Sequence, residues 1–213
     1  MKEELEGLNK IVKVLNKNKI HFWMYGGALA GYVKINDLFP WDGDVDLLVW
    51  EEDFSRLFDI RKQFDIPYIW KEYCLALRCA KGQKNVDIST YVKKGDVAIH
   101  EKTLPTKNIL GRIIYYKIIP RLVDSNMKRT TNFLTWFMRR THIGYMVRFE
   151  VPLKYFDNLK EIDLFGIKLK VPEDHEGFMD YSYGPYWRLP VEEQEKDYDR
   201  TGKCDPRYYQ VIK

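Results

Sequence analysis

Cysteine is scarce in this sequence. The chain has only Cys74, Cys79 and Cys204 among its 213 residues, and their spacing matches no metal-binding pattern. A small and odd number of cysteines excludes a scaffold held by disulfides and fits a reducing compartment. A hydrophobic core must therefore hold the fold together, and the chain is long enough to bury one.

Long apolar runs are also missing. Lys or Arg interrupts every apolar stretch, so no segment approaches the roughly 20 apolar residues that span a bilayer. The opening stretch MKEELEGLNK carries acidic residues and lacks the apolar region of a secretory signal. Because 45% of the residues are hydrophobic and 31% are charged, we expect a soluble globular protein that is cytoplasmic, or peripheral to a membrane.

Acidic residues are nearly absent from one part of the chain. The net charge is only +4, yet residues 107–148 hold nine Lys or Arg and a single acid, Asp124. Such a basic block implies an anionic partner, either phosphates, a lipid surface or nucleic acid. Nucleic acid is the least favoured of the three, because the block matches no recognised reading motif.

The length fits one domain over residues 1–213, with a basic helical insertion at about 105–145. Periodicity and turn signals predict the main elements along it. We expect helices at 3–18, 28–34, 51–64, within 107–140 and at 173–181, and strands at 20–25, 44–50, 85–91, 149–154 and 164–171.

The most informative stretch is the acidic start of the strand at 44–50. Successive side chains of a strand alternate between its faces, so Asp44 and Asp46 lie side by side while Val45 and Leu47 point the other way. Two carboxylates held so close repel each other, and a hard divalent cation removes the conflict. The pattern therefore predicts a site for Mg²⁺ or Mn²⁺.

A glycine pair precedes this strand. Gly26 and Gly27 follow an apolar strand and lead into the helix at 28–34. A glycine turn at a helix N-terminus offers free backbone N–H groups, which predicts a phosphate site. By itself a glycine pair is typical of a plain turn, and the acidic strand downstream is what favours the phosphate site.

A third carboxylate, Asp87, lies in the strand NVDISTY with its side chain opposite to Val86 and Ile88. One interpretation is a polar residue on the solvated face of an antiparallel strand. The other is that strand pairing brings Asp87 beside Asp44 and Asp46, where three carboxylates hold metal for phosphoryl transfer.

The basic block has two interpretations as well. Its apolar residues, such as Ile113 and Trp136, could form two core helices with solvated Lys and Arg around them. Alternatively, residues 107–148 form a basic amphipathic surface for an anionic lipid or a phosphate-bearing polymer.

These residues together resemble the LicD and fukutin-type phosphotransferases of the nucleotidyltransferase-fold superfamily. The resemblance covers roughly residues 8–190, leaves 100–145 unmatched, and is most specific in the segment PWDGDVD. The matching pieces are Gly26-Gly27 with Leu29 and Gly31, Pro40 to Asp46, Asp87, the segment FGIKLKVP, Tyr183-Gly184, Trp187 and Pro190.

The resemblance implies an α+β fold, with a mixed β-sheet flanked by helices. It also implies transfer of a phospho-alcohol, such as phosphocholine or ribitol phosphate, from a CDP-activated donor to a glycan or glycolipid hydroxyl, with release of CMP. The implied site is made of metal-binding and catalytic carboxylates and of substrate-binding residues: Asp44, Asp46 and Asp87 in the first group, and Gly26, Gly27, Lys34, Trp41 and Asp42 in the second.

Two positions depart from the family pattern. Ala28 replaces the usual Thr or Ser after the glycines, and Lys34 replaces an Arg, which keeps the charge but loses the bidentate fork. Two other functions stay open: a nucleotidyltransferase that adds NMP to a small molecule or protein, and a catalytically inactive protein that binds anionic ligands.

Overall fold

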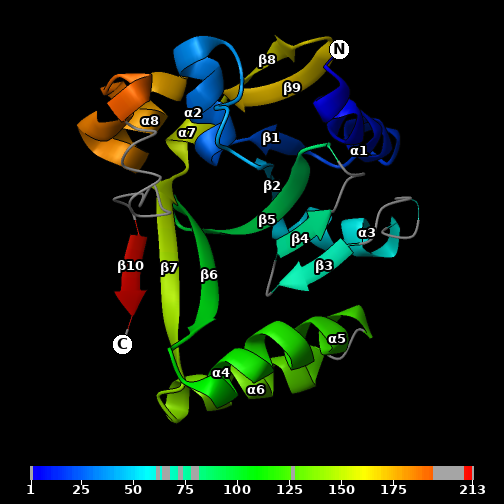
Figure 1. Ribbon diagram of the computed structural model, residues 1–213, viewed down its shortest axis with the longest axis vertical. Helices are drawn as coiled ribbons and strands as arrows, with labels where there is room; N and C mark the ends of the chain where they lie inside the picture. Colours follow the sequence, from blue (N-terminus) through cyan, green and yellow to red (C-terminus); the bar gives the residue numbers. More distant parts are fainter. Residues whose placement is uncertain are drawn as a thin grey trace.

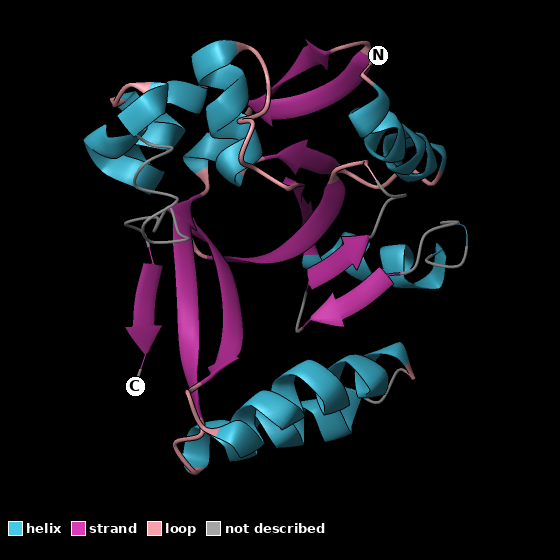
Figure 2. Ribbon diagram, in the orientation of Figure 1, coloured by secondary structure: helices cyan, strands magenta, loops and turns pink. Residues whose placement is uncertain are grey.

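The computed structural model describes residues 2–60, 63, 68–71, 74–77, 82–125, 128–193 and 209–212. Within these ranges the chain forms an eight-stranded mixed sheet, helices packed against it, and a separate two-stranded sheet. Figures 1 and 2 show this arrangement, and it confirms the predicted α+β class with a mixed sheet flanked by helices.

The helices differ widely in length. The α-helices are α1 Glu6–Lys17, α2 Gly26–Ile35, α3 Glu51–Ile60, α4 Ile109–Ile113, α5 Ile119–Asp124, α6 Lys128–Arg140, α7 Lys154–Asp157 and α8 His175–Tyr183. Short 3₁₀ turns cover Glu3–Leu5 and Gly184–Arg188, and a π-helical turn covers Ile114–Ile118.

The large sheet contains eight of the strands. They are β1 Phe22–Met24, β2 Asp44–Trp50, β3 Tyr68–Lys71, β4 Cys74–Leu77, β5 Asn85–Lys94, β6 Val97–Pro105, β7 Gly144–Pro152 and β10 Tyr209–Ile212. The small sheet pairs β8 Leu159–Leu164 with β9 Ile167–Pro172.

Strand β5 is the centre of the large sheet. It pairs in parallel with β2 along residues 85–91, and antiparallel with β4 on its other side. Its last residues, 92–94, pair antiparallel with the start of β6. Strand β6 then continues beside β7 as a long ribbon that ends at the pair Pro105 and Gly144.

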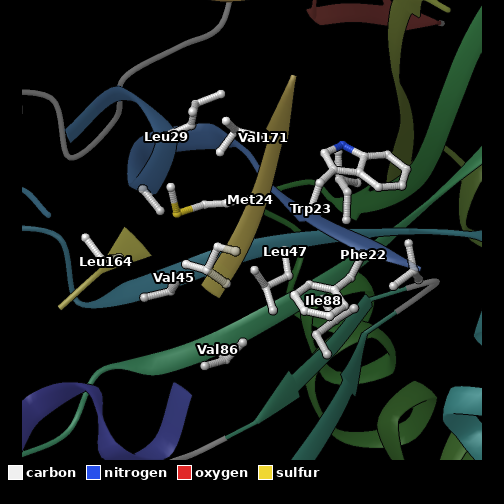
Figure 3. Close-up of a cluster of buried hydrophobic side chains, with 14 of the residues drawn as sticks. Phe22, Trp23, Met24, Leu29, Val45, Leu47, Val86, Ile88, Leu164 and Val171 are labelled. Atoms are coloured by element: carbon white, nitrogen blue, oxygen red, sulfur yellow. The ribbon is translucent and has the colours of Figure 1, made fainter. Parts of the chain in front are cut away.

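The alternation predicted for the acidic strand decides where the core lies. Val45 and Leu47 of β2, with Val86 and Ile88 of β5, are fully buried on one face. Figure 3 shows these side chains meeting others from β1, α2 and the small sheet. Because the apolar side chains occupy this face, the aspartates of both strands point to the other.

The prediction of a single strand at 164–171 was wrong. The segment is the second half of a hairpin, in which β8 and β9 meet at a tight turn over Phe165 and Gly166. Both turn residues have positive φ, +53° and +86°, the backbone that a two-residue hairpin of this hand requires. Phenylalanine gives no sequence signal for such a turn.

Other boundaries also differ. Strand β7 begins at Gly144, five residues before the predicted start, and β6 was not predicted at all. The predicted helix at 51–64 is α3, which covers 51–60; residues 61, 62 and 64 lie outside the described part of the chain.

The predicted helical segment within 105–145 is present between β6 and β7. We call residues 106–143 the helical insertion. Figure 1 shows it as a layer of helices at the far end of the β6–β7 ribbon. The helix does not stop at Pro120: in the π-helical turn before it, the Ile119 N–H bonds to the Ile114 carbonyl and α5 then continues. None of the helices in the described ranges is both long and apolar enough to cross a bilayer.

Candidate active site

The parallel pairing of β2 with β5 assembles the acidic residues. In its register Asp46 is opposite Asp87, and Asp44 is opposite Asn85. Directly opposed residues of neighbouring strands point to the same face, so the carboxylate of Asp87 lies beside that of Asp46. The structure thus brings the third predicted carboxylate to the other two, on a parallel strand.

The start of α2 lies against the same carboxylates. A methyl group added at Gly26 would be 2.6 Å from Oδ2 of Asp46, and one added at Gly27 would be 2.5 Å from Oδ2 of Asp42. Gly26 also has φ +64°, where side chains are strained. The predicted glycine turn is therefore built into the acidic cluster, and any larger residue would displace a carboxylate.

Electrostatic repulsion is concentrated on Asp46. Burial raises the pKa of its carboxyl well above the ordinary value of 3.8, and the charges of Asp44, Asp42 and Asp87 raise it further. The charge of Lys102, on β6, acts in the opposite direction. Three carboxylates thus act on Asp46, and the positive charge of Lys102 offsets part of their effect.

Asp42 is the second carboxyl with a strongly raised pKa, which reaches about 7. Burial is the largest cause, followed by a side-chain hydrogen bond and the negative charge of Asp44. Lys84 counteracts the effect through its charge, and its ammonium donates to the main-chain carbonyl of Asp42. Asp42 therefore belongs to the cluster.

Lys84 and Lys102 were missed by the sequence reasoning. Lys84 sits in the turn before β5, where its N–H bonds to the Glu4 carbonyl at 2.9 Å. Lys102 could have been found only if β6 had been recognised, and the residues VAIHEKTLP alternate too poorly to indicate a half-buried strand.

Two predicted substrate residues, Lys34 and Trp41, make contacts with other parts of the chain. Lys34 is in the last turn of α2, about 12 Å along the helix axis from Gly26. Its ammonium donates to the main-chain carbonyl of Trp187 at 2.8 Å and to that of Leu189. Trp41 stacks on Phe39 with ring centroids 4.7 Å apart, in the loop that leads to the acidic strand.

The cluster has the right chemistry for a hard cation. Within the described ranges, no group of three or more His, Cys, Asp or Glu side chains is placed to hold a metal ion. Mg²⁺, however, usually takes one or two protein carboxylates and completes its octahedron with waters and substrate phosphates. The crowded carboxylates fit that mode, and the metal role of Asp44, Asp46 and Asp87 stays a prediction.

The raised pKa values predict a pH dependence of stability without divalent cations. The unfolded chain loses the proton of Asp42 near pH 3.8, whereas the folded protein keeps it to about pH 7. Between these values the folded state binds more protons, so the free energy of unfolding falls as pH rises. Urea denaturation in EDTA should show a decline from pH 5 to 8 that Asp42→Asn reduces.

A matched control for this prediction is Asp163→Asn. The pKa of Asp163 is lowered by the Gly166 N–H and by Lys168, so this group adds stability above its ordinary pKa and not below it. The decline from pH 5 to 8 should survive in that variant. If Asp42→Asn and the wild type lost the same stability over this range, the pKa of Asp42 would not be raised in the folded protein.

The sequence comparisons agree with this arrangement. The family model described as "LicD/FKTN/FKRP, nucleotidyltransferase domain" matches residues 19–174. This range contains the glycine turn and all four clustered carboxylates. The chain belongs to the LicD/FKTN/FKRP family. The resemblance found in the motifs is thereby confirmed.

The relatives of this chain include proteins of known activity and uncharacterised ones. Ribitol 5-phosphate transferase FKRP of Mus musculus is 24% identical over 176 residues, covering 82% of this chain and 30% of the relative. An uncharacterised protein of Rickettsia typhi is 30% identical over 89 residues, covering 41% of this chain and 28% of the relative. The chain thus spans under a third of the length of either relative.

Proposed function

We propose that this chain is a metal-dependent phosphotransferase. It would move a phospho-alcohol, such as phosphocholine or ribitol phosphate, from a CDP-activated donor to a glycan or glycolipid hydroxyl and release CMP. The observation that carries the proposal is the cluster of Asp42, Asp44 and Asp87 around Asp46, in which Asp42 and Asp46 lie against the glycine turn of α2. Family membership supports it, as does the similarity to the mouse ribitol 5-phosphate transferase.

The proposed roles follow from position. Asp44, Asp46 and Asp87 are the carboxylates that would hold Mg²⁺ or Mn²⁺, which when bound neutralises donor phosphates. Gly26 and Gly27 let the start of α2 approach the carboxylates of Asp46 and Asp42 closely, so a diphosphate bound through the cation would lie near a helix N-terminus, which favours anions and has no side-chain cap. Residues 1–213 would form one nucleotidyltransferase-fold domain around this site.

The two lysines near the cluster add a role that the motif did not contain. Lys84 and Lys102 carry the positive charges that act on Asp42 and Asp46. An ammonium beside a diphosphate stabilises the charge that develops on the leaving group. We therefore assign both lysines to charge balance in the site, a role that Lys34 would fill only by leaving its two carbonyls.

The proposed step is a displacement at phosphorus. The acceptor hydroxyl oxygen forms a bond to the phosphorus of the phospho-alcohol, and the bond from that phosphorus to the bridging oxygen of CMP breaks. Asp87 accepts the hydroxyl proton, and CMP leaves with the bridging oxygen. In such reactions the protein mainly positions the groups and neutralises charge, which suits a rigid pair of strands.

A thermal-shift panel tests the proposal. CDP-ribitol, CDP-choline, CTP, UTP and ATP are each added with and without Mg²⁺ or Mn²⁺. At a ligand concentration of about 100 Kd, binding should stabilise the fold by about 2.7 kcal/mol and raise Tm by roughly 5–10 °C. We expect this shift only when a cytidine nucleotide and a cation are present together, and not in Asp44→Asn.

The products separate the competing functions. Release of CMP on incubation with the stabilising CDP-alcohol and a glycan acceptor supports the phosphotransferase. Retention of the nucleotide on the product would instead indicate an NMP transferase. Nucleotide binding that needs no cation and persists in Asp44→Asn would indicate an inactive binding protein and would overturn the proposal.

A further inference from the structure

The helical insertion exposes an unusual share of the apolar surface. Seven of the eleven exposed large apolar side chains in the described ranges lie in it: Ile109, Leu110, Ile113, Tyr116, Ile118, Phe133 and Trp136. Ile109 is 76% exposed and Phe133 58%, so their side chains are mostly in water. Clustered apolar side chains of this kind mark interaction surfaces, because soluble surfaces rarely keep them.

The insertion has little core of its own. Its helices pack through a small cluster made by Ile114, Tyr115, Ile119 and Met138, which is separate from the main core. In the described part of the insertion, seven large apolar side chains are thus exposed while four are buried in its core cluster. The core-helix interpretation of the basic block consequently explains only its inner face.

The spacing puts the exposed residues on one face of the first helix. Ile109 and Ile113 are one turn apart in α4, Leu110 is beside them, and Tyr116 is exposed in the π-helical turn that follows. The opposite side of the helix packs closely on the chain at Gly111, where an added methyl group would be only 2.3 Å from the Ile143 carbonyl oxygen. Since Gly111 faces inward, the face formed by Ile109, Leu110, Ile113 and Tyr116 points away from the protein. We call it the α4 face.

The charges around the α4 face are of one sign. Lys107, Arg112 and Lys117 are interleaved with its apolar residues and are exposed. The stretch from 107 to 123 contains no acidic residue, and the only acid up to Arg148 is Asp124. The α4 face therefore presents apolar and cationic groups in alternation. This pattern matches an anionic bilayer, whose acyl chains take apolar side chains and whose phosphate headgroups take cations.

We propose that the helical insertion docks on an anionic lipid bilayer through the α4 face. Ile109, Leu110 and Ile113 enter the boundary between headgroups and acyl chains, Tyr116 lies at the headgroup level, and the three cations bind lipid phosphates. The helix lies in the plane of the surface. This docking does not depend on the reaction proposed above, and its test needs no turnover.

Vesicle flotation tests the proposal with the full chain. Vesicles of phosphatidylcholine alone are compared with vesicles of phosphatidylcholine mixed with phosphatidylglycerol. We expect the protein to float with the anionic vesicles and to stay behind with the neutral ones. The double variant Ile109→Gln, Ile113→Gln should weaken partitioning about tenfold or more, and Arg112→Gln, Lys117→Gln should weaken it and flatten its salt dependence.

Each double variant has a matched control. Ile35→Gln, Val92→Gln removes two other exposed apolar side chains, 40% and 43% exposed, outside the insertion. Lys13→Gln, Lys17→Gln removes two exposed cations from α1. Both controls should float like the wild type, and all variants should unfold at similar temperatures because the replaced side chains are at the surface.

Three results would overturn the proposal. Equal flotation of the wild type and the Ile109, Ile113 variant would show that charge alone is responsible. Failure to float together with a wild-type dimer that these substitutions dissociate would identify the α4 face as a contact between two copies. Tight RNA binding that the apolar substitutions leave intact, without flotation, would point to a polyanion.

Discussion

Asp46→Asn is expected to lower the rate of phosphotransfer by about a thousandfold and, at the same time, to make the protein more stable. The side chain of Asp46 is half-buried, and its pKa is raised by burial and by the charges of Asp44, Asp42 and Asp87. Removing its charge relieves that repulsion, and Tm should rise by roughly 2–4 °C for each kcal/mol relieved. CMP release and thermal unfolding at pH 8 in EDTA measure the two effects on one preparation.

The opposite signs make this prediction specific. Replacing a residue with a purely structural role would lower activity and stability together. A carboxylate that serves to bind a cation instead destabilises the cation-free protein, so replacing it lowers activity and raises stability. Asp59→Asn, a surface substitution on α3, provides the control and should change neither quantity. Near wild-type turnover in Asp46→Asn would remove Asp46 from the catalytic site.

Gly26→Ala should be the most damaging small substitution at the site. The new methyl group would meet Oδ2 of Asp46 at 2.6 Å, and φ +64° is unfavourable for alanine by about 1–2 kcal/mol. Displacing a reacting group by about 1 Å can cost a hundredfold in rate. We therefore expect a loss of stability of a few kcal/mol, measured by urea denaturation, with at least a hundredfold loss of CMP release.

Two other glycines separate the causes of this effect. Gly95 has the same φ of +64° but open space around its added methyl group, so Gly95→Ala should lose stability and keep activity. Gly43 has open space and no positive φ, so Gly43→Ala should change little. If Gly95→Ala lost as much activity as Gly26→Ala, the close approach to Asp46 would not be the reason.

The sequence predicted the parts of the site that depend on local periodicity. Asp44 and Asp46 share a face because alternation along one strand needs no partner, and the structure has that strand at 44–50 as predicted. The position of Asp87 beside them depends on register with a strand about forty residues away. Only the assembled sheet decides between a solvated antiparallel strand and a parallel neighbour.

The parts that the sequence did not reveal are those set by distant contacts. Lys102 reaches the cluster on a strand whose residues are mixed in character, and Lys34 bonds to main-chain carbonyls 153 and 155 residues away. Main-chain acceptors have no side-chain signature. The motif therefore predicted Lys34 as a phosphate ligand, whereas in the folded chain its ammonium donates to two main-chain carbonyls.

The position of β5 has a consequence for how the protein folds. The turn at Gly95 and Asp96 joins β5 to β6 locally, so this hairpin, which pairs residues 92–94 with 97–99, can form early. Its parallel contact with β2 closes a much longer loop and should form later. Asp87 thus first meets Asp44 and Asp46 when β5 pairs with β2, and we expect refolding to be slowed at high pH, where that encounter brings like charges together.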